Sequence, residues 1–221
     1  MQKRTRLADR ALPHYSTAEE ITNTLTHAVG LLFGIAALIL CLPRCQGKIA
    51  LAACVIYGSS MILLYATSSI YHGLKPCLGK KVLQIIDHCT IYSLIAGSYT
   101  PIVLTAIAPK YPLIGWGLFA AEWALAALAT TLTAIDLKKY SVFSMICYIG
   151  MGWAVIIFWR QTLEVMTLPG FALLLSGGIA YTIGSILYGI GKKKKWMHSV
   201  FHIFVVLGAT LQFLSVLLYA V

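Results

Sequence analysis

The sequence predicts an all-α integral membrane protein with seven transmembrane helices. Hydrophobic residues make up 59% of the 221 residues and charged residues only 11%, whereas about a quarter of an ordinary soluble domain is charged. Apolar runs of about 18 to 24 residues recur along almost the whole chain, and a helix of this length crosses a bilayer. Because backbone amides in lipid must be satisfied within their own segment, we expect each run to be a helix.

The predicted spans are separated by short interruptions, each of which carries a charge or a proline. These interruptions are Pro43/Arg44, Lys75/Pro76, Pro109/Lys110, Asp136/Lys138, Arg160/Glu164 and Lys192 to Lys195. They place the spans at about residues 24–42, 49–71, 83–107, 113–135, 143–159, 168–188 and 197–221. Residues 1–23 are then an N-terminal segment and residues 24–221 the transmembrane domain. The first apolar run lacks a small-residue cleavage site, so we interpret it as a span and not as a signal peptide.

The basic residues are distributed unevenly between the two sets of loops. Thirteen lysines and arginines, including Lys3 and Arg4, lie on the side of the N-terminus, and four lie on the other side. Cytoplasmic loops carry the excess of basic residues, so the sequence predicts a cytoplasmic N-terminus and an external C-terminus. The run from Lys192 to Lys195 could also bind anionic lipid headgroups, but we favour the topological interpretation.

The net charge of +10 does not indicate a nucleic-acid-binding protein, because the basic residues lie in short loops and not on one face. The six cysteines form no CxxC pair, and most fall in apolar runs, where cysteine behaves as a small hydrophobe. We therefore expect membrane lipids as partners and no nucleic acid.

Four ionisable side chains are predicted to lie inside the spans at one depth. His72 ends the second span, Asp87 lies early in the third, and His198 and His202 begin the seventh. At about 1.5 Å per residue, all four lie within roughly 5 to 10 Å of the cytoplasmic boundary. Ionisable groups in a membrane are costly, so their shared layer predicts a functional site.

The residue types in this layer favour a zinc site. His198 and His202 are four residues apart and project from one helix face, so both can hold one metal ion. With His72 they would supply three imidazoles and leave a position for water, as in catalytic zinc sites. Asp87 could be a fourth ligand, directly or through water, or the carboxylate that shuttles the proton. Ser68 is a poor zinc ligand and is expected to donate a hydrogen bond to the water, a carboxylate or an oxyanion.

A polar stripe of Glu20, Asn23 and His27 enters the first span at the same level. We expect these residues to support the metal ligands, although His27 could equally make a polar contact between helices. The start of this helix offers two alternative capping boxes, Ser16 with Glu19 or Thr17 with Glu20.

Three further residues have simpler interpretations. His88 points about 100° away from Asp87 around the helix, so we expect a structural role. His14 is expected to lie in an exposed tail. Glu122, in the middle of the fourth span, is interpreted as a protonated, hydrogen-bonded interior residue in preference to a ligand.

The combined motifs resemble the hemolysin III branch of the progestin and adipoQ receptor family. The resemblance rests on Glu20-x2-Asn23-x3-His27, Ser68-x3-His72, Asp87-His88 through Ser98-Tyr99-Thr100-Pro101, and His198-x3-His202. This family includes the adiponectin receptors and is similar at motif level to alkaline ceramidases. The resemblance implies a seven-helix fold with zinc near the cytoplasmic face, ligated by His72, His198 and His202. It also implies a bacterial inner-membrane location.

These observations lead to three functional hypotheses. The first is a zinc-dependent hydrolase that cleaves an amide or ester bond of a lipid, with Asp87 and Ser68 in catalytic roles. The second is a non-catalytic membrane-homeostasis or receptor-like protein with structural zinc. The third is a cytolytic protein, which the family label suggests but which the concentration of polar residues at one level does not favour.

Overall fold

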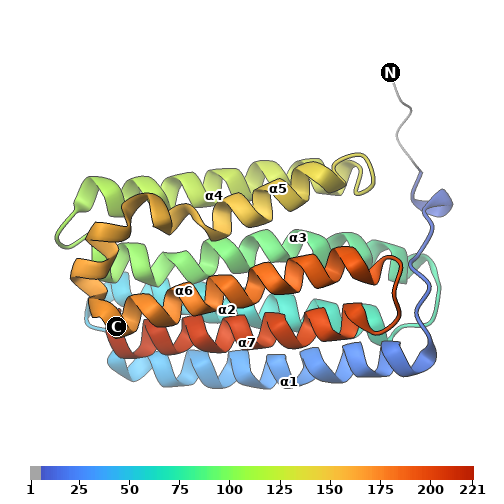
Figure 1. Ribbon diagram of the computed structural model, residues 1–221, viewed down its shortest axis with the longest axis horizontal. Helices are drawn as coiled ribbons and strands as arrows, with labels where there is room; N and C mark the ends of the chain where they lie inside the picture. The colour runs from blue at the N-terminus through green and yellow to red at the C-terminus, as the bar shows by residue number, and fades with distance from the viewer. Residues whose placement is uncertain (1–5) are drawn as a thin grey trace.

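The computed structural model describes residues 6–221, and all regular structure within that range is helical, without a strand. This confirms the predicted fold class. The helices lie side by side with their axes roughly parallel (Figure 1). Lys3 and Arg4, which entered the predicted charge bias, lie outside the described residues. The side of the membrane on which each end lies stays a prediction.

The helix bounds agree with most of the predicted spans to within a few residues. The helices are α1 (Thr17–Cys41), α2 (Gly47–Gly73), α3 (Leu78–Pro101), α4 (Pro112–Ile135), α5 (Ser141–Gly152), α6 (Trp159–Gly191) and α7 (Met197–Tyr219). The third predicted span continues beyond Pro101 as a short π-helix over Ile102–Ile107. Helix α1 begins where α2 ends and α7 begins (Figure 1), so the predicted site residues of these helices gather at one end of the bundle.

By length and composition, the described residues contain six candidate membrane spans. One of them, Ser141–Gly191, has 51 residues, which as a straight helix would extend about 77 Å against a hydrocarbon core of about 30 Å. Figure 1 shows that α5 and α6 within this segment run in opposite directions. The segment therefore has the length and the reversal that two crossings need.

The break between the fifth and sixth spans was expected at Arg160/Glu164, between residues 159 and 168. The backbone leaves helical geometry within this interval, at Thr167, with φ 59° and ψ 169°, whereas Arg160 and Glu164 themselves are helical. The charged residues fit a helix because they lie at its exposed end, where the Glu164 carboxylate accepts hydrogen bonds from Lys110 and Tyr111. This contact raises the pKa of the Lys110 ammonium group.

A capping box starts α1 earlier than the predicted span. The Ser16 hydroxyl accepts a hydrogen bond from the backbone N–H of Glu19, whose carboxylate accepts from the Ser16 backbone N–H. The Ser16 and Glu19 alternative is thus the correct one. The buried Glu19 carboxylate also accepts a hydrogen bond from the Trp196 backbone N–H, at 2.7 Å. Trp196 has φ 67° and precedes α7 directly, so this bond fixes the start of the helix that carries two histidines.

Candidate metal centre

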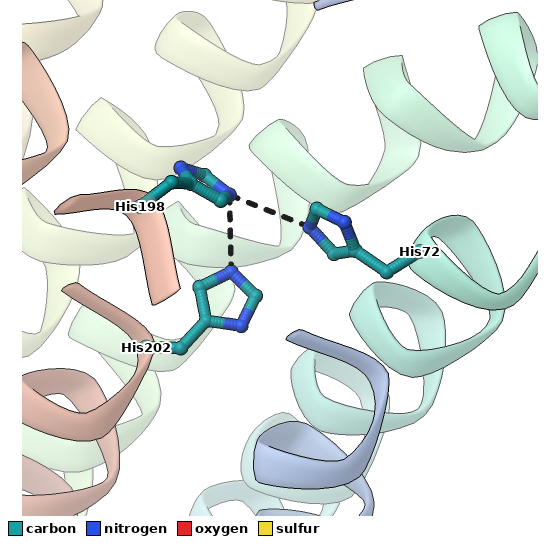
Figure 2. Close-up of side chains that lie close together, drawn as sticks. All are labelled: His72, His198 and His202. Carbon is teal, nitrogen blue, oxygen red and sulfur yellow. Dashed lines mark hydrogen bonds between the residues drawn. The ribbon is translucent and has the colours of Figure 1, made fainter. Parts of the chain in front are cut away.

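Three buried histidines from two helices converge on one point. His72 lies near the end of α2, and His198 and His202 lie in the first two turns of α7. The His198 Nε2 atom is 3.4 Å from His72 Nε2 and 3.1 Å from His202 Nε2, and Figure 2 shows the three rings facing one another. The ligand atoms of the three residues all lie within 4.8 Å of one another, so they could hold one metal ion.

The spacing of these nitrogens fits a tetrahedral ion. With metal–nitrogen bonds of about 2.0 to 2.1 Å, neighbouring ligand nitrogens of a tetrahedral zinc site lie about 3.3 Å apart. The observed 3.1 and 3.4 Å bracket that value. The i, i+4 relation of His198 and His202 therefore brings their Nε2 atoms together as the sequence predicted.

Glu20 orients the imidazole of His72. Its Oε2 atom lies 2.6 Å from His72 Nδ1. A carboxylate at this position accepts the Nδ1 proton, which leaves the lone pair on Nε2, the atom that faces the other two histidines. Glu20 thus holds one of the three histidines that could bind a metal ion.

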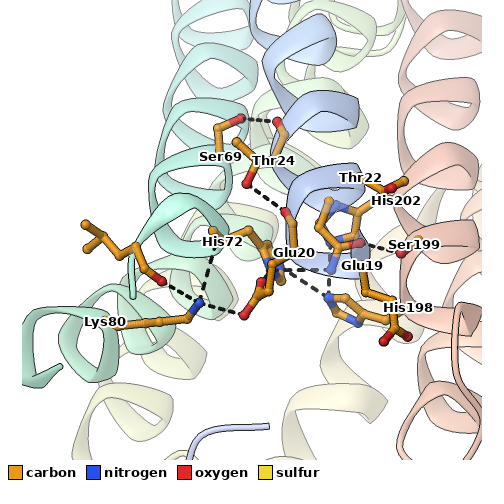
Figure 3. Close-up of polar contacts among 12 residues, drawn as sticks. Glu19, Glu20, Thr22, Thr24, Ser69, His72, Lys80, His198, Ser199 and His202 are labelled. Atoms are coloured by element: carbon orange, nitrogen blue, oxygen red, sulfur yellow. Dashed lines mark hydrogen bonds and ion pairs between the residues drawn. The ribbon is translucent and has the colours of Figure 1, made fainter. Parts of the chain in front are cut away.

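A buried lysine completes this arrangement. The Lys80 ammonium group lies 2.6 Å from Glu20 Oε1 and 2.8 Å from the Leu74 carbonyl oxygen (Figure 3). Lys80 is only 3% exposed. Lys80 therefore balances the charge of the carboxylate that holds His72, a role quite different from the loop charge that the sequence suggested.

Asn23 connects α1 to both helices that carry the three histidines. Its Oδ1 atom accepts a hydrogen bond of 2.7 Å from the Ser199 hydroxyl, and its Nδ2 atom lies 3.4 Å from His72 Nδ1. Both Asn23 and Ser199 are buried. The amide therefore fixes α7 relative to α2 next to the histidines.

Asp87 lies outside the three-histidine group, although the sequence placed it at the same depth. No described carboxylate belongs to that group. Instead, the Asp87 side chain interacts with Ser68 and lines a cavity that His198 and His202 also line. Of the alternatives left open for Asp87, direct coordination is the one that this arrangement does not support.

An apolar cavity of about 120 Å³ runs from the histidines into the bundle. Ser68, Asp87 and His202 line its polar end, and Gln212 lines its deep end, ten residues further along α7, or about 15 Å along the axis. Most of the wall between them is aliphatic or aromatic. The lining of the cavity therefore has the polarity that suits an apolar group with a polar end near the histidines.

Comparison with known proteins now identifies the family. The family model described as "Haemolysin-III related" matches residues 15–213. The chain belongs to the haemolysin-III family. The resemblance inferred from the motifs is thereby confirmed.

Individual relatives agree with this family assignment. The chain is 37% identical to "Hemolysin-3" of Bacillus cereus over 204 residues, 91% of either chain. It is 35% identical to "Hemolysin-3 homolog" of Bacillus subtilis (strain 168) over 210 residues, 94% of this chain and 97% of that protein. It is also 26% identical to "Heptahelical transmembrane protein 4" of Arabidopsis thaliana over 185 residues, 73% of this chain and 47% of that protein.

His27 packs against one of the three histidines of this haemolysin-III chain. Its ring stacks on His202, with centroids 3.7 Å apart and an interplanar angle of 12°. Neither ring nitrogen has a hydrogen-bond partner among the described residues. The contact of His27 with His202 is therefore ring stacking and not a hydrogen bond.

The N-terminal segment of the haemolysin-III chain covers the histidines. The Tyr15 ring stacks on His198 at a centroid distance of 4.8 Å and lies 5.8 Å from the His72 ring. Burial raises the pKa of the Tyr15 hydroxyl, so the ring stays neutral. Tyr15 was not predicted, and its only sequence signal is its position next to the capping residue Ser16. His14, one residue earlier, is exposed as expected.

Two other ionisable residues lie apart from the three-histidine group. His88 Nδ1 lies 2.8 Å from the Gln84 carbonyl oxygen and His88 Nε2 lies 3.2 Å from the Tyr188 hydroxyl, contacts that agree with the expected structural role. Glu122 is buried in α4, and its Oε2 atom has no hydrogen-bond partner among the described residues. Within residues 6–221, the Oε2 atom of Glu122 therefore does not make the hydrogen bond that we expected for this side chain.

Proposed function

We propose that this protein is a zinc-dependent membrane hydrolase that cleaves an amide or ester bond of a lipid. The observation that carries the proposal is the convergence of three imidazoles, two of which, His198 and His202, line the polar end of an apolar cavity. A lipid with its chain in that cavity would present its carbonyl group to the histidines.

Three histidine ligands favour zinc and leave one of its coordination positions open. Neutral imidazoles suit zinc, and three protein ligands leave a position for water or substrate. Zinc bound by His72, His198 and His202 would supply a Lewis acid and lower the pKa of a bound water towards about 7.

Asp87 and Ser68 would carry the proton chemistry. The Asp87 carboxylate is not among the metal ligands, so it can take a proton from the attacking water and return it to the leaving group. Ser68 lies against Asp87 and lines the same cavity. Its hydroxyl would orient the carboxylate or donate a hydrogen bond to the oxyanion.

The lipid would come from the leaflet at the histidine end of the bundle. The positive-inside bias of the sequence makes this the cytoplasmic leaflet, and the two Bacillus relatives favour a bacterial inner membrane. A pore, which the name "Hemolysin-3" of these relatives suggests, is less favoured: it needs a polar path, and most of the buried ionisable side chains, among them Glu19, His72 and Lys80, lie at the histidine end of the bundle.

The test is hydrolysis by zinc-loaded protein in native-like bilayers that contain N-acylated lipids. We expect release of free fatty acid, loss of release on chelation and recovery on zinc addition. Asp87→Asn should abolish release and keep most of the zinc, because the carboxylate acts on protons and does not hold the ion. The matched control is Asp9→Asn, which removes an exposed carboxylate that does not line the cavity and should leave release unchanged.

Two outcomes would contradict the proposal. If zinc-loaded protein hydrolyses no amide or ester across a broad lipid panel, the receptor-like alternative with structural zinc replaces it. If Asp87→Asn retains full release, the assigned proton path is wrong.

A further inference from the structure

A second cavity opens beside the first at the same end of the bundle. Its volume is about 630 Å³, within the range of about 300 to 1,000 Å³ that small-molecule sites occupy. We call it the vestibule. It lies between the start of α3, the turn from α4 to α5, and the end of α6, and its lining includes Gln84, Lys138 and Lys192.

The vestibule and the apolar cavity share a wall. His88, Tyr148 and Tyr188 line both of them, and so do Thr182 and Ser185 of α6. A molecule that reaches the apolar cavity through this wall would leave its outer part in the vestibule. The two cavities together therefore match an amphiphile, with an apolar chain on one side and a polar group on the other.

The charge of the vestibule has one sign. Lys138 and Lys192 line it, and no aspartate or glutamate of the described chain does. The nearest acidic residue in sequence, Asp136, accepts hydrogen bonds from the backbone N–H groups of Lys138 and Lys139, both at 3.1 Å. Lys192 is held over the Tyr188 ring, with its Nζ atom 5.4 Å from the ring centroid.

We propose that the vestibule binds the phosphate group of an anionic phospholipid. Two ammonium groups attract the negative charge, and the hydroxyl of Ser141 on the lining can donate a hydrogen bond to a phosphate oxygen. The aliphatic residues of the same lining contact the glycerol and the first chain carbons. As a choice of substrate class this rests on the proposed hydrolase function, but headgroup binding requires no catalysis.

The experiment uses two pairs of substitutions with equal loss of charge. Lys138→Gln/Lys192→Gln removes both vestibule lysines, and Lys139→Gln/Lys193→Gln removes an exposed lysine beside each of them that does not line the cavity. Each protein is reconstituted in bilayers of equal parts phosphatidylcholine and phosphatidylglycerol. After detergent washing, mass spectrometry measures the ratio of the two lipids that stay bound.

We expect the wild type to retain an excess of phosphatidylglycerol. The vestibule pair should lower that excess roughly tenfold, because each lysine near a phosphate contributes to lipid affinity, and the control pair should leave it nearly unchanged. An equal loss in both pairs would indicate general attraction of the basic surface and would overturn the proposal. Inorganic phosphate that displaces the lipid and binds lipid-free protein as tightly would overturn the lipid as the source.

The two proposals can fail separately. Chelator-treated protein should keep the lysine-dependent lipid excess, because the measurement does not depend on zinc. Persistent retention without any hydrolysis would contradict the proposed function alone. Hydrolysis of lipids without lysine-dependent retention would contradict the vestibule alone.

Discussion

The bundle has a closely packed side, formed by α1, α2 and α7, and a hollow side, where α5 and α6 face α3. A Cβ atom added at Gly30 of α1 would lie 2.6 Å from the Tyr65 ring, and one at Gly58 of α2 would lie 2.7 Å from Leu38 Cβ. On α5, a Cβ added at Gly150 or Gly152 would meet nothing within 4 Å. Glycines on the first side thus allow helices to approach, and those on α5 do not.

This difference corresponds to two tasks. The packed side carries all three histidines together with Glu20 and Asn23, and a metal site needs ligands fixed to within about 0.5 Å. The hollow side lines both cavities with residues of α5 and α6, and a chain must enter there. The tight contact of α1 with α2 therefore lies on one side of the bundle and the open lining of α5 on the other.

The largest expected effect is on the packed side. His198→Ala/His202→Ala should lower the zinc content of purified protein from about one ion per chain to nearly none, because two of three ligands are lost. Metal analysis after gel filtration measures this, and His14→Ala, in the exposed segment, should keep the ion. Full zinc retention in the double variant would remove the proposed site.

A smaller effect is expected for Glu20, which touches a ligand and not the ion. Glu20→Gln should weaken zinc affinity about 10- to 100-fold, the usual cost of losing a supporting carboxylate. Competition with a chelator of known affinity measures the change. Glu164→Gln breaks the other described carboxylate–lysine pair, which is half-exposed at the far end of the bundle, and should leave the affinity unchanged. Equal effects of the two substitutions would indicate a general loss of charge.

The depth of the site could be predicted from the sequence because helix rise converts residue number into height. That argument brought His72, His198 and His202 into one layer, and their Nε2 atoms do converge. It could not predict rotation about the helix axis, which directs Asp87 towards Ser68 and the cavity. Helix rise alone therefore predicts a shared layer and cannot predict the contact of Asp87 with Ser68.

Two residues that contact the predicted residues Glu20 and Asn23, namely Lys80 and Ser199, were not predicted, for a related reason. We expected the third span to begin near residue 83, but α3 begins at Leu78, so Lys80 is carried into the bundle and not left in a loop. Its partner Glu20 was recognised, yet no pattern within one helix indicates a contact between residues 60 positions apart. The same holds for Ser199 and Asn23, which join α7 to α1.

The smallest expected effect is on stability and comes from two glycines. Gly150 lies on an exposed face of α5, and Gly58 lies where α2 packs against α1. Replacing a helical glycine by alanine alone stabilises a helix by about 0.5 to 1 kcal/mol. At Gly150 nothing opposes this gain, because the new methyl group meets no atom within 4 Å. At Gly58 the methyl group would meet Leu38 Cβ at 2.7 Å, and a Cβ atom cannot move without its backbone.

We therefore expect opposite signs from the two substitutions. Gly58→Ala should destabilise the protein by about 1 to 3 kcal/mol through overpacking of α1 against α2, and Gly150→Ala should be neutral or slightly stabilising. Thermal unfolding in detergent measures both, and zinc affinity should fall only in Gly58→Ala, since α2 carries His72. Equal stability of the two variants would mean that α1 and α2 are as loosely packed as α5, and the division of the bundle into a rigid and an open side would not hold.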